Sequence, residues 1–444
     1  MKTLPKLSFW QIFNMSFGFL GVQIGYSLQN GNTSRILSAL GANVEHLSYF
    51  WLAAPLAGLI VQPIVGLSSD KTWTRLGRRI PFILGGAIVS AIAMFFMPNS
   101  EFFTYLLPAL FFGGFMLLFM DTSFNVTMQP FRALVGDMVS EKQRNQGYAV
   151  QSFLINAGAV IGSILPFILT WLGVANTPAP GHKIAPTVIW AFYFGGGTLL
   201  LSVLWTSFST KEYAPADYEQ YHSISQEEKS HSSFLTLLRD IPGTMWKLAI
   251  VQFFSWFALF LMWVFTTSGI AQNVWHTASG DSTSLAFNEA ANWVGVIFAA
   301  YSLFAALFSL VMARLASRFG RKTVYMLSLL TGGLSLISMV FVHNQYALIA
   351  SMVGIGISWA AVLAMPYTIL SASLPASKMG IYMGLFNATI TIPQIAAGLL
   401  GGLILTLVGG QAIMMLVFAG LSMVIAGLCV VFVKEHKDVE SSTK

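Results

Sequence analysis

One short stretch of the chain combines an acid, a base and amides within an apolar surround. The stretch FMDTSFNVTMQPFRALVGDM, residues 119–138, contains Asp121 and Arg132. In a helix of 3.6 residues per turn, Asn125 and Arg132 fall within about 40° of Asp121, and Gln129 lies about 80° away. Arg132 is then about 16 Å along the axis from the acid. Such a stripe can exchange a proton and bind a polar ligand, and what it does depends on the surrounding medium.

The composition indicates that this medium is lipid. Hydrophobic residues make up 55% of the 444 residues, charged residues only 9%, and the mean hydropathy is +0.70. Soluble proteins contain roughly 25% charged residues, so this chain could not cover a surface that faces water. We therefore predict a polytopic membrane protein. Its first apolar run lacks a clear small-residue cleavage site, so no cleaved signal peptide is expected.

Apolar runs of the length that crosses a bilayer, about 20 residues, predict twelve spans. They cover residues 9–30, 47–68, 80–98, 103–129, 146–172, 186–207, 245–271, 291–313, 322–342, 345–371, 380–407 and 411–433. The fourth and tenth spans are expected to extend past the lipid into the cytoplasm. The predicted fold class is an all-α membrane protein with twelve transmembrane helices.

The basic residues predict the orientation, because Lys and Arg concentrate in cytoplasmic loops. With the N-terminus inside, the 23 basic residues fall on the cytoplasmic side except Arg35 and Lys183, which fall outside, and Arg132, in or near the membrane. We expect both termini to be cytoplasmic and the protein to reside in the cytoplasmic (inner) membrane. The net charge of +6 then reflects topology, and no nucleic-acid partner is expected.

The chain divides into two similar halves around a polar, Ser-rich linker. The predicted parts are a six-helix bundle at 1–208, a cytoplasmic linker at 209–243, a second six-helix bundle at 244–434 and a cytoplasmic tail at 435–444. GLSSDKTWTRLGRRIPF follows the second span, and ARLASRFGRKTVY follows the eighth. Parallel repeats of six spans are the pattern of major facilitator transporters, which the chain resembles.

The loop after the second span is similar to the cytoplasmic loop motif of that superfamily. The matching residues, with three extra residues among them, are Gly66, Asp70, Lys71, Arg75, Gly77, Arg78 and Arg79. An acid near an arginine cluster can close the cytoplasmic side in one state and release it in another. We predict a cytoplasmic gate formed by Asp70, Arg75, Arg78, Arg79 and Asp137. The alternative is that these are ordinary basic loops of the cytoplasmic side.

Asp121 is predicted to lie near mid-membrane, on a span that runs from outside to inside. An acid at that depth costs roughly 2.5–3.5 kcal/mol on insertion scales, so it normally serves a function. We predict that Asp121 binds and releases a proton, because alternation between dry and wet surroundings changes its affinity for the proton. One alternative is a structural pair with Arg132. Another is a sodium site that uses Thr122, Asn125 and Thr127.

Four stretches resemble the plant sucrose–proton symporters and their animal and bacterial relatives, a branch close to the glycoside–pentoside–hexuronide cation symporters. They are GVQIGYSLQ, GLIVQPIVGLSSDKTWTRLGRRIPFI, Asp121 with the later Arg-Ala-Leu run and Asp137, and GLFNATITIPQIAAG. The resemblance implies proton coupling by Asp121, and sugar binding and coupling by Arg132. The chain departs from the family at Ile80, where an Arg is usual, and at Pro130-Phe131, where Gly-Pro is usual.

A sugar presents hydroxyl groups in all directions and one apolar face, which amides and aromatic rings suit best. The predicted substrate-binding residues are Gln23, Tyr26, Gln29, Asn125, Gln129, Arg132, Trp256, Asn387 and Gln394. Trp256 and Trp263 share one helix face, and either ring could stack on a sugar. For each amide the alternative is a hydrogen bond between helices, and for each Trp it is packing or an interfacial position.

The residues contain no arrangement typical of an enzyme. The sequence offers no metal pair at helical spacing, no nucleotide-binding loop and no nucleophile with a base beside it, so no cofactor or metal is predicted. We predict a secondary active transporter, functional as a monomer among membrane lipids, that takes up a glucosyl disaccharide such as sucrose or maltose with a proton. The alternatives are a sodium-coupled glycoside symporter, a proton-coupled exporter of another small solute, and a receptor without transport.

Overall fold

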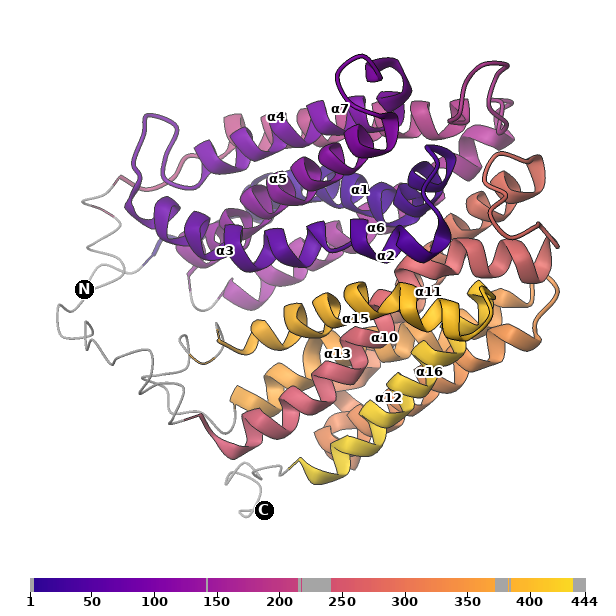
Figure 1. Cartoon of the computed structure of the whole chain (residues 1–444). Coiled ribbons are helices and arrows are strands. Elements are labelled where there is room, and N and C mark those ends of the chain that lie inside the picture. The colour runs from indigo at the N-terminus through magenta and orange to yellow at the C-terminus, as the bar shows by residue number, and fades with distance from the viewer. Residues whose placement is uncertain are drawn as a thin grey trace. The chain divides into compact units, whose positions relative to one another are not determined.

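The computed structural model describes residues 4–140, 143–214, 217, 241–371, 382 and 385–433, without the side chains of residues 67, 70, 71, 144, 145 and 371. Twelve long helices dominate these residues (Figure 1): α1 (Phe9–Ala39), α3 (Ala53–Lys71), α4 (Ile80–Phe96), α5 (Ala109–Met138), α6 (Arg144–Trp171), α7 (Pro186–Ser209), α10 (Gly243–Val274), α11 (Leu285–Phe319), α12 (Arg321–Ser338), α13 (Leu348–Ser371), α15 (Ala388–Leu407) and α16 (Ala412–Cys429). Short helical elements are η1 (Val44–His46), α2 (Leu47–Phe50), η2 (Met97–Phe103), η5 (Met339–Phe341) and η7 (Val430–Phe432).

Eleven helical segments in the described residues are long and apolar enough to cross a membrane. The 31-residue α1 is not among them, because polar residues such as Asn14, Gln23 and Gln29 lower its hydropathy. α1 and the eleven segments correspond to the twelve predicted spans, although the start of the eleventh span lies outside the described residues. The prediction of an all-α membrane protein is confirmed.

α1 is longer than the span expected at 9–30 and continues to Ala39. Its last turns contain polar residues that are buried inside the protein, not placed in a loop. Asn32 Nδ2 and Thr33 Oγ1 each donate to a carbonyl one turn earlier, at 3.0 and 2.7 Å. These bonds satisfy the side chains within the helix, so the helix does not end where the apolar run ends.

The fold divides into two compact units that alternate along the sequence. The first comprises Met1–Ala42, Leu56–Ser230 and Ser282–Ala299, and the second comprises Asn43–Pro55, His231–Asp281 and Ala300–Lys444. α11 therefore contributes its first half to the first unit and its second half to the second. The predicted bundle boundaries stay a prediction. The predicted linker (209–243) lies largely outside the described residues, and the tail (435–444) lies entirely outside them.

In the first unit, α1 packs against α5, α6 and α7, and α4 packs against α5 and α7. Gly158 and Gly162 of α6 allow α1 to approach, since a Cβ on either would lie 2.4 Å from a backbone oxygen of α1. Small residues four apart permit such close packing in lipid, where van der Waals contact replaces the hydrophobic effect. The rings of Phe19 and Phe131, 5.0 Å apart, fill the space between α1 and α5. This packing fixes the register of α1 against α5.

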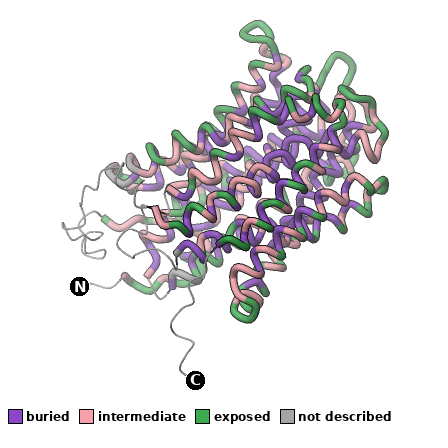
Figure 2. The backbone as a smooth tube through the Cα atoms, turned by 60° about the horizontal axis from the view of Figure 1, so that its bottom comes forward, coloured by how far each residue is buried: buried purple, intermediate pink, exposed green. Residues whose placement is uncertain are grey.

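In the second unit, α10 packs against α13, α15 and α16, and α12 packs against α13 and α16. A Cβ on Gly333 of α12 would lie 2.7 Å from the oxygen of Gly420 on α16, so these two helices also meet through glycine. Figure 2 shows buried and exposed residues on the same helices. Large apolar side chains such as Leu201 and Leu310 are exposed, as expected for surfaces that face lipid tails.

Candidate functional site

Asp121 is enclosed within the first unit, near the middle of α5. Its side chain is 2% exposed, and Gln29 Nε2 on α1 donates to its Oδ1 at 2.5 Å. The second carboxyl oxygen, Oδ2, and the amide oxygen of Gln29 are buried without a hydrogen-bond partner among the described residues. Burying an ionised carboxylate with an unpaired oxygen costs far more free energy than burying a neutral acid. The arrangement suits a group that takes up a proton or accepts a hydrogen bond from a ligand.

The predicted stripe on α5 contains a buried acid and an exposed base. The Arg132 side chain is exposed and that of Gln129 is half-buried, whereas Asp121 is enclosed. Asn125 Nδ2 donates to the main-chain oxygen of Asp121 at 2.8 Å, and its Oδ1 accepts from Gln62 Nε2 at 2.6 Å. Asn125 thus joins α5 to α3 through an amide pair. The carboxyl group of Asp121 itself bonds to Gln29.

The predicted residues of α1 face the same part of α5. The ring of Tyr26 meets the ring of Phe124 edge to face, with centroids 5.9 Å apart. Because Phe124 lies one turn after Asp121, Tyr26 and Gln29 both contact α5 around the acid. Gln23, one turn before Tyr26, is half-buried. The structure therefore brings Tyr26, Gln29 and Asp121 together.

Trp256 belongs to an aromatic cluster inside the second unit. The rings of Trp256 and Trp263 on α10, Tyr301 on α11 and Trp359 on α13 form pairs with centroids 5.7 to 6.5 Å apart. Trp263 Nε1 donates to Tyr301 Oη at 3.4 Å. Trp256 Nε1 is buried without a partner among the described residues. Aromatic faces suit the apolar face of a sugar, and an unpaired indole N–H can donate to a hydroxyl group.

The two remaining predicted ligands lie at the start of α15. Asn387 is exposed, and its Oδ1 accepts a hydrogen bond from Tyr367 Oη on α13 at 3.2 Å. Gln394 is half-buried. These residues and Trp256 belong to the second unit, whereas Asp121 and its neighbours belong to the first.

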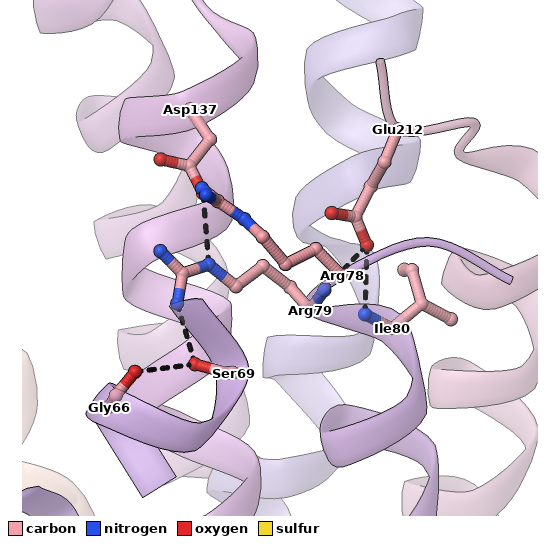
Figure 3. Close-up of polar contacts among 7 residues, drawn as sticks. All are labelled: Gly66, Ser69, Arg78, Arg79, Ile80, Asp137 and Glu212. Atoms are coloured by element: carbon pink, nitrogen blue, oxygen red, sulfur yellow. Dashed lines mark hydrogen bonds and ion pairs between the residues drawn. The ribbon is translucent and has the colours of Figure 1, made fainter. Parts of the chain in front are cut away.

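The loop between α3 and α4 directs two arginines to the end of α5 (Figure 3). Asp137 Oδ2 accepts from an Nη of Arg78 at 2.6 Å and from Nε of Arg79 at 2.9 Å. Arg79 also donates to Ser69 Oγ at 2.6 Å. The Arg79 side chain is only 7% exposed, so its charge depends on Asp137 for compensation. Ser69, Arg78, Arg79 and Asp137, with Glu212 described below, form the Asp137 cluster.

The other two residues of the predicted gate are Arg75 and Asp70. Arg75 is exposed, and the side chain of Asp70 lies outside the described residues. A tight turn lies between α3 and α4, where Thr74 and Gly77 exchange backbone hydrogen bonds of 3.0 and 3.1 Å. Gly77 has a φ of 115°, which glycine adopts without strain. The turn positions Arg78 and Arg79 next to Asp137.

Glu212, which no sequence motif singled out, completes the Asp137 cluster from beyond α7. Its Oε1 accepts the backbone N–H groups of Arg79 at 2.8 Å and Ile80 at 2.9 Å, at the start of α4 (Figure 3). These first N–H groups have no partner within their own helix, and a carboxylate there also interacts favourably with the helix dipole. Burial raises the pKa of Glu212, although the backbone hydrogen bonds oppose the shift.

Sequence comparisons relate the chain to known membrane transporters. The family model described as Major Facilitator Superfamily matches residues 15–287 and 248–444. The general alpha-glucoside permease of Schizosaccharomyces pombe is 27% identical over 291 residues, which cover 61% of this chain and 50% of that protein. The sucrose transport protein SUC4 of Arabidopsis thaliana is 24% identical over 416 residues, which cover 84% of this chain and 80% of that protein.

Solved transporter structures share the fold. A crystal structure of the nucleoside transporter NupG has a TM-score of 0.66 at 15% identity and covers 97% of this chain and 99% of its own. A bacterial homolog of the human lysosomal transporter Spinster has a TM-score of 0.63 at 13% identity. The match covers 96% of this chain and 95% of that chain. At these identities the likeness concerns the fold alone.

Proposed function

Because the chain belongs to the Major Facilitator Superfamily, and is thus a membrane transporter and not an enzyme, we propose that it takes up a sugar together with a proton. The resemblance to sugar symporters seen in its motifs is confirmed by relatives named as sucrose transport proteins and an alpha-glucoside permease. Sucrose is itself an α-glucoside. We therefore propose a glucosyl disaccharide, such as sucrose or maltose, as the substrate.

The observation that carries the proposal is the enclosed carboxyl group of Asp121. It has one neutral hydrogen-bond donor, Gln29, and one oxygen without a partner among the described residues. In this enclosed state the neutral acid is favoured, since the charged form would lose its hydration and gain no cation. When water reaches the group, the carboxylate is hydrated and the proton can leave. Alternation between the two states couples proton movement to the transport cycle.

The side chains near Asp121 favour a proton over a sodium ion. A hard cation is held by several oxygens at once. Thr127 Oγ1 lies against α4, where a Cβ on Gly86 would stand 2.2 Å from it, whereas the Asp121 carboxyl group bonds to Gln29 on α1. The Oδ1 atom of Asn125 accepts a hydrogen bond from Gln62 on α3. The oxygens that a sodium site would use on α5 therefore lie against different helices. Sodium coupling remains the alternative that the transport assay below must exclude.

We propose that amide and aromatic side chains, together with Arg132, bind the sugar. The candidates are Gln23, Tyr26, Gln29, Asn125, Gln129, Arg132, Trp256, Asn387 and Gln394. We also propose that the Asp137 cluster holds α3, α4 and α5 together in one state and releases them in another. Its two ion pairs are short and mostly shielded from water, so breaking them requires a change of the whole cluster.

Purified protein in liposomes tests the function directly. We expect an acid-outside pH gradient to drive accumulation of labelled sucrose or maltose, and a sodium gradient alone to drive none. Asp121→Asn should abolish this accumulation but retain exchange of labelled for unlabelled sugar. Exchange requires no net movement of protons, and the substituted side chain has nearly the same size.

Asp137→Asn is the matched control, because it removes an acid from the same helix but outside the proposed proton site. We expect it to slow transport while pH-driven accumulation is retained. Accumulation by Asp121→Asn at the level of the unaltered protein would exclude the proton role. Failure of the unaltered protein to move either sugar under either gradient would exclude this substrate class.

A further inference from the structure

Arg35, near the end of α1, is an enclosed cation surrounded by amides. Its side chain is 2% exposed, and its guanidinium donates to the Oδ1 atoms of three asparagines. The bonds run to Asn288 at 2.9 and 2.7 Å, to Asn292 at 2.7 Å and to Asn176 at 2.8 Å. Asn176 lies in the α6–α7 connection, and the other two lie one turn apart on α11. All three are more than nine-tenths buried, and all four residues belong to the first unit.

The chemistry of this cluster is unusual for a buried charge. A buried arginine normally pairs with a carboxylate, whose two oxygens match its planar fork. Among the described residues, every hydrogen bond of the Arg35 guanidinium goes to a neutral amide. The closed cluster therefore bears the cost of desolvating a cation without the attraction of an opposite charge.

Asn176 is the position where a different side chain would bind Arg35 more strongly. Its Oδ1 accepts from Arg35 and from Thr187 Oγ1 at 2.9 Å. Its Nδ2 is buried without a partner among the described residues. An aspartate in this position would keep both hydrogen bonds and place a negative charge beside Arg35, whose attraction offsets the cost of a second buried carboxylate oxygen in place of the N–H group. The same fold could therefore hold the cluster more tightly than it does.

The cluster attaches the first half of α11 to α1 and α6. Asn292 Nδ2 donates to Thr170 Oγ1 on α6 at 2.7 Å. One turn along, Gly295 lies so close to α6 that a Cβ would stand 2.1 Å from the oxygen of Ser163. From Ala300 onward, α11 belongs to the second unit. The cluster thus holds the first half of the helix that the two units share.

We propose that Arg35, Asn176, Asn288 and Asn292 form a latch that opens once in each transport cycle and releases the first half of α11. The inference rests on the proposed transport function, and the predicted orientation places the latch on the outer side of the membrane. Four hydrogen bonds keep the latch closed, and the absence of a carboxylate from those bonds keeps it weak enough to open. Arg35 acts here as a positioning residue for α11.

Gly31 provides a reporter position beside the latch. It lies one turn before Arg35 on α1 and is buried, yet a Cβ there would have no heavy atom within 4 Å apart from its chain neighbours and the nearby backbone of its own helix. Gly31→Cys in a Cys429→Ser background therefore introduces a single thiol into open space. The rate at which a small water-soluble reagent modifies this thiol measures opening of the latch. The assay needs no transported sugar, so failure of the latch and failure of the proposed function are distinguishable.

Asn176→Asp is the decisive variant, because it loses no described hydrogen bond. We expect it to slow modification of the Gly31→Cys thiol by about tenfold, since an ionised acceptor forms a markedly stronger bond than a neutral one. In sugar uptake, the maximal rate should fall while KM stays unchanged. Arg35→Ala should instead speed modification by about tenfold, which corresponds to about 1.4 kcal/mol. Arg35→Lys should restore only part of the slow rate, because an ammonium group lacks the planar fork.

A second reporter, Ser422→Cys, is buried on α16 of the second unit and detects general loosening. The latch is overturned if the rate at Gly31→Cys is unchanged in both Asn176→Asp and Arg35→Ala. It is also overturned if Arg35→Ala raises the rates at both reporters equally. Should Arg35→Ala fail to fold, Asn176→Asp decides alone: slower modification supports the latch, and an unchanged or faster rate excludes it.

Discussion

Individual polar atoms distinguish the predicted site residues from one another. Asp121 Oδ2 and Trp256 Nε1 are buried without a partner among the described residues, whereas Asn125 and Asn387 bond to Gln62 and Tyr367. Buried polar groups nearly always have a partner, so an unpaired one calls for an explanation. The proposed proton and sugar would supply these partners during part of the transport cycle.

Trp256→Phe tests whether the unpaired indole N–H donates to the sugar. The substitution keeps an aromatic ring for the contacts with Trp263 and Trp359 but removes the donor. Loss of one hydrogen bond of about 1 kcal/mol should raise KM for the sugar roughly fivefold. Initial uptake rates at varied sugar concentration in liposomes provide the measurement.

Trp263→Phe is the matched control, because its N–H already has a partner in Tyr301. This variant loses the same ring area but should leave KM close to that of the unaltered protein. Equal increases of KM in both variants would show that ring size, and not the Trp256 N–H group, determines affinity.

The sequence was sufficient to predict an acid within a membrane-spanning helix at Asp121, because an acid inside an apolar run stands out without any knowledge of its neighbours. It was not sufficient for Glu212 or for the role of Arg35. Glu212 bonds to residues 132 and 133 positions away, and the partners of Arg35 lie 141 to 257 positions away. No local spacing encodes such pairs. Because Arg35 follows the first apolar run, the sequence predicts only that it lies on the outer side, and it does not reveal that the side chain is buried in the last turns of α1.

At the scale of elements, the length of apolar runs predicted the helices well. The span expected at 186–207 is α7, Pro186–Ser209, and the span expected at 146–172 is α6, Arg144–Trp171. One difference occurs in the last turns of α1, where polar residues are buried by other helices. Hydropathy measures transfer into lipid, so it does not register a polar side chain that is satisfied inside the protein.

Glu212 follows α7 and accepts hydrogen bonds from the backbone at the start of α4. Because this carboxyl group is titratable, we expect the stability of the protein to depend on pH. Burial and the charge of Asp137 raise the pKa of Glu212 above its ordinary value of 4.5. As the pH rises from 4.5 through the raised pKa, the folded protein binds more protons than the unfolded one, so stability falls. Glu212→Gln keeps an acceptor for both backbone N–H groups but cannot ionise. Its thermal unfolding temperature in detergent should lack this decline.

Glu212→Ala separates the hydrogen bonds from the titration. It leaves the N–H groups of Arg79 and Ile80 without their acceptor, so the free energy of unfolding should fall by about 1 kcal/mol, as when a helix cap is lost. This loss should persist at every pH. An unchanged pH dependence in Glu212→Gln would mean that another group causes the decline.

At the scale of the whole molecule, the first unit contains two clusters of different chemistry. The Asp137 cluster uses ion pairs, whereas the Arg35 latch uses a cation with neutral amides. In the predicted orientation the two lie on opposite sides of the membrane. A transporter that alternates access closes one side of the membrane while the other side opens. If the two clusters differ in strength, the protein without substrate favours the state in which the stronger cluster is closed.

The assignment of these sides depends on the orientation of the chain, which the basic residues predict. Ala179 in the α6–α7 connection and Ser317 near the end of α11 are both exposed and suit single cysteines in a Cys429→Ser background. A membrane-impermeant thiol reagent should label Ala179→Cys in intact cells, and should label Ser317→Cys only after the membrane is opened. This is expected because Arg314, Arg318 and Arg321 flank Ser317, and basic segments stay in the cytoplasm. The reverse labelling pattern would contradict the predicted orientation and would place the Arg35 latch inside and the Asp137 cluster outside.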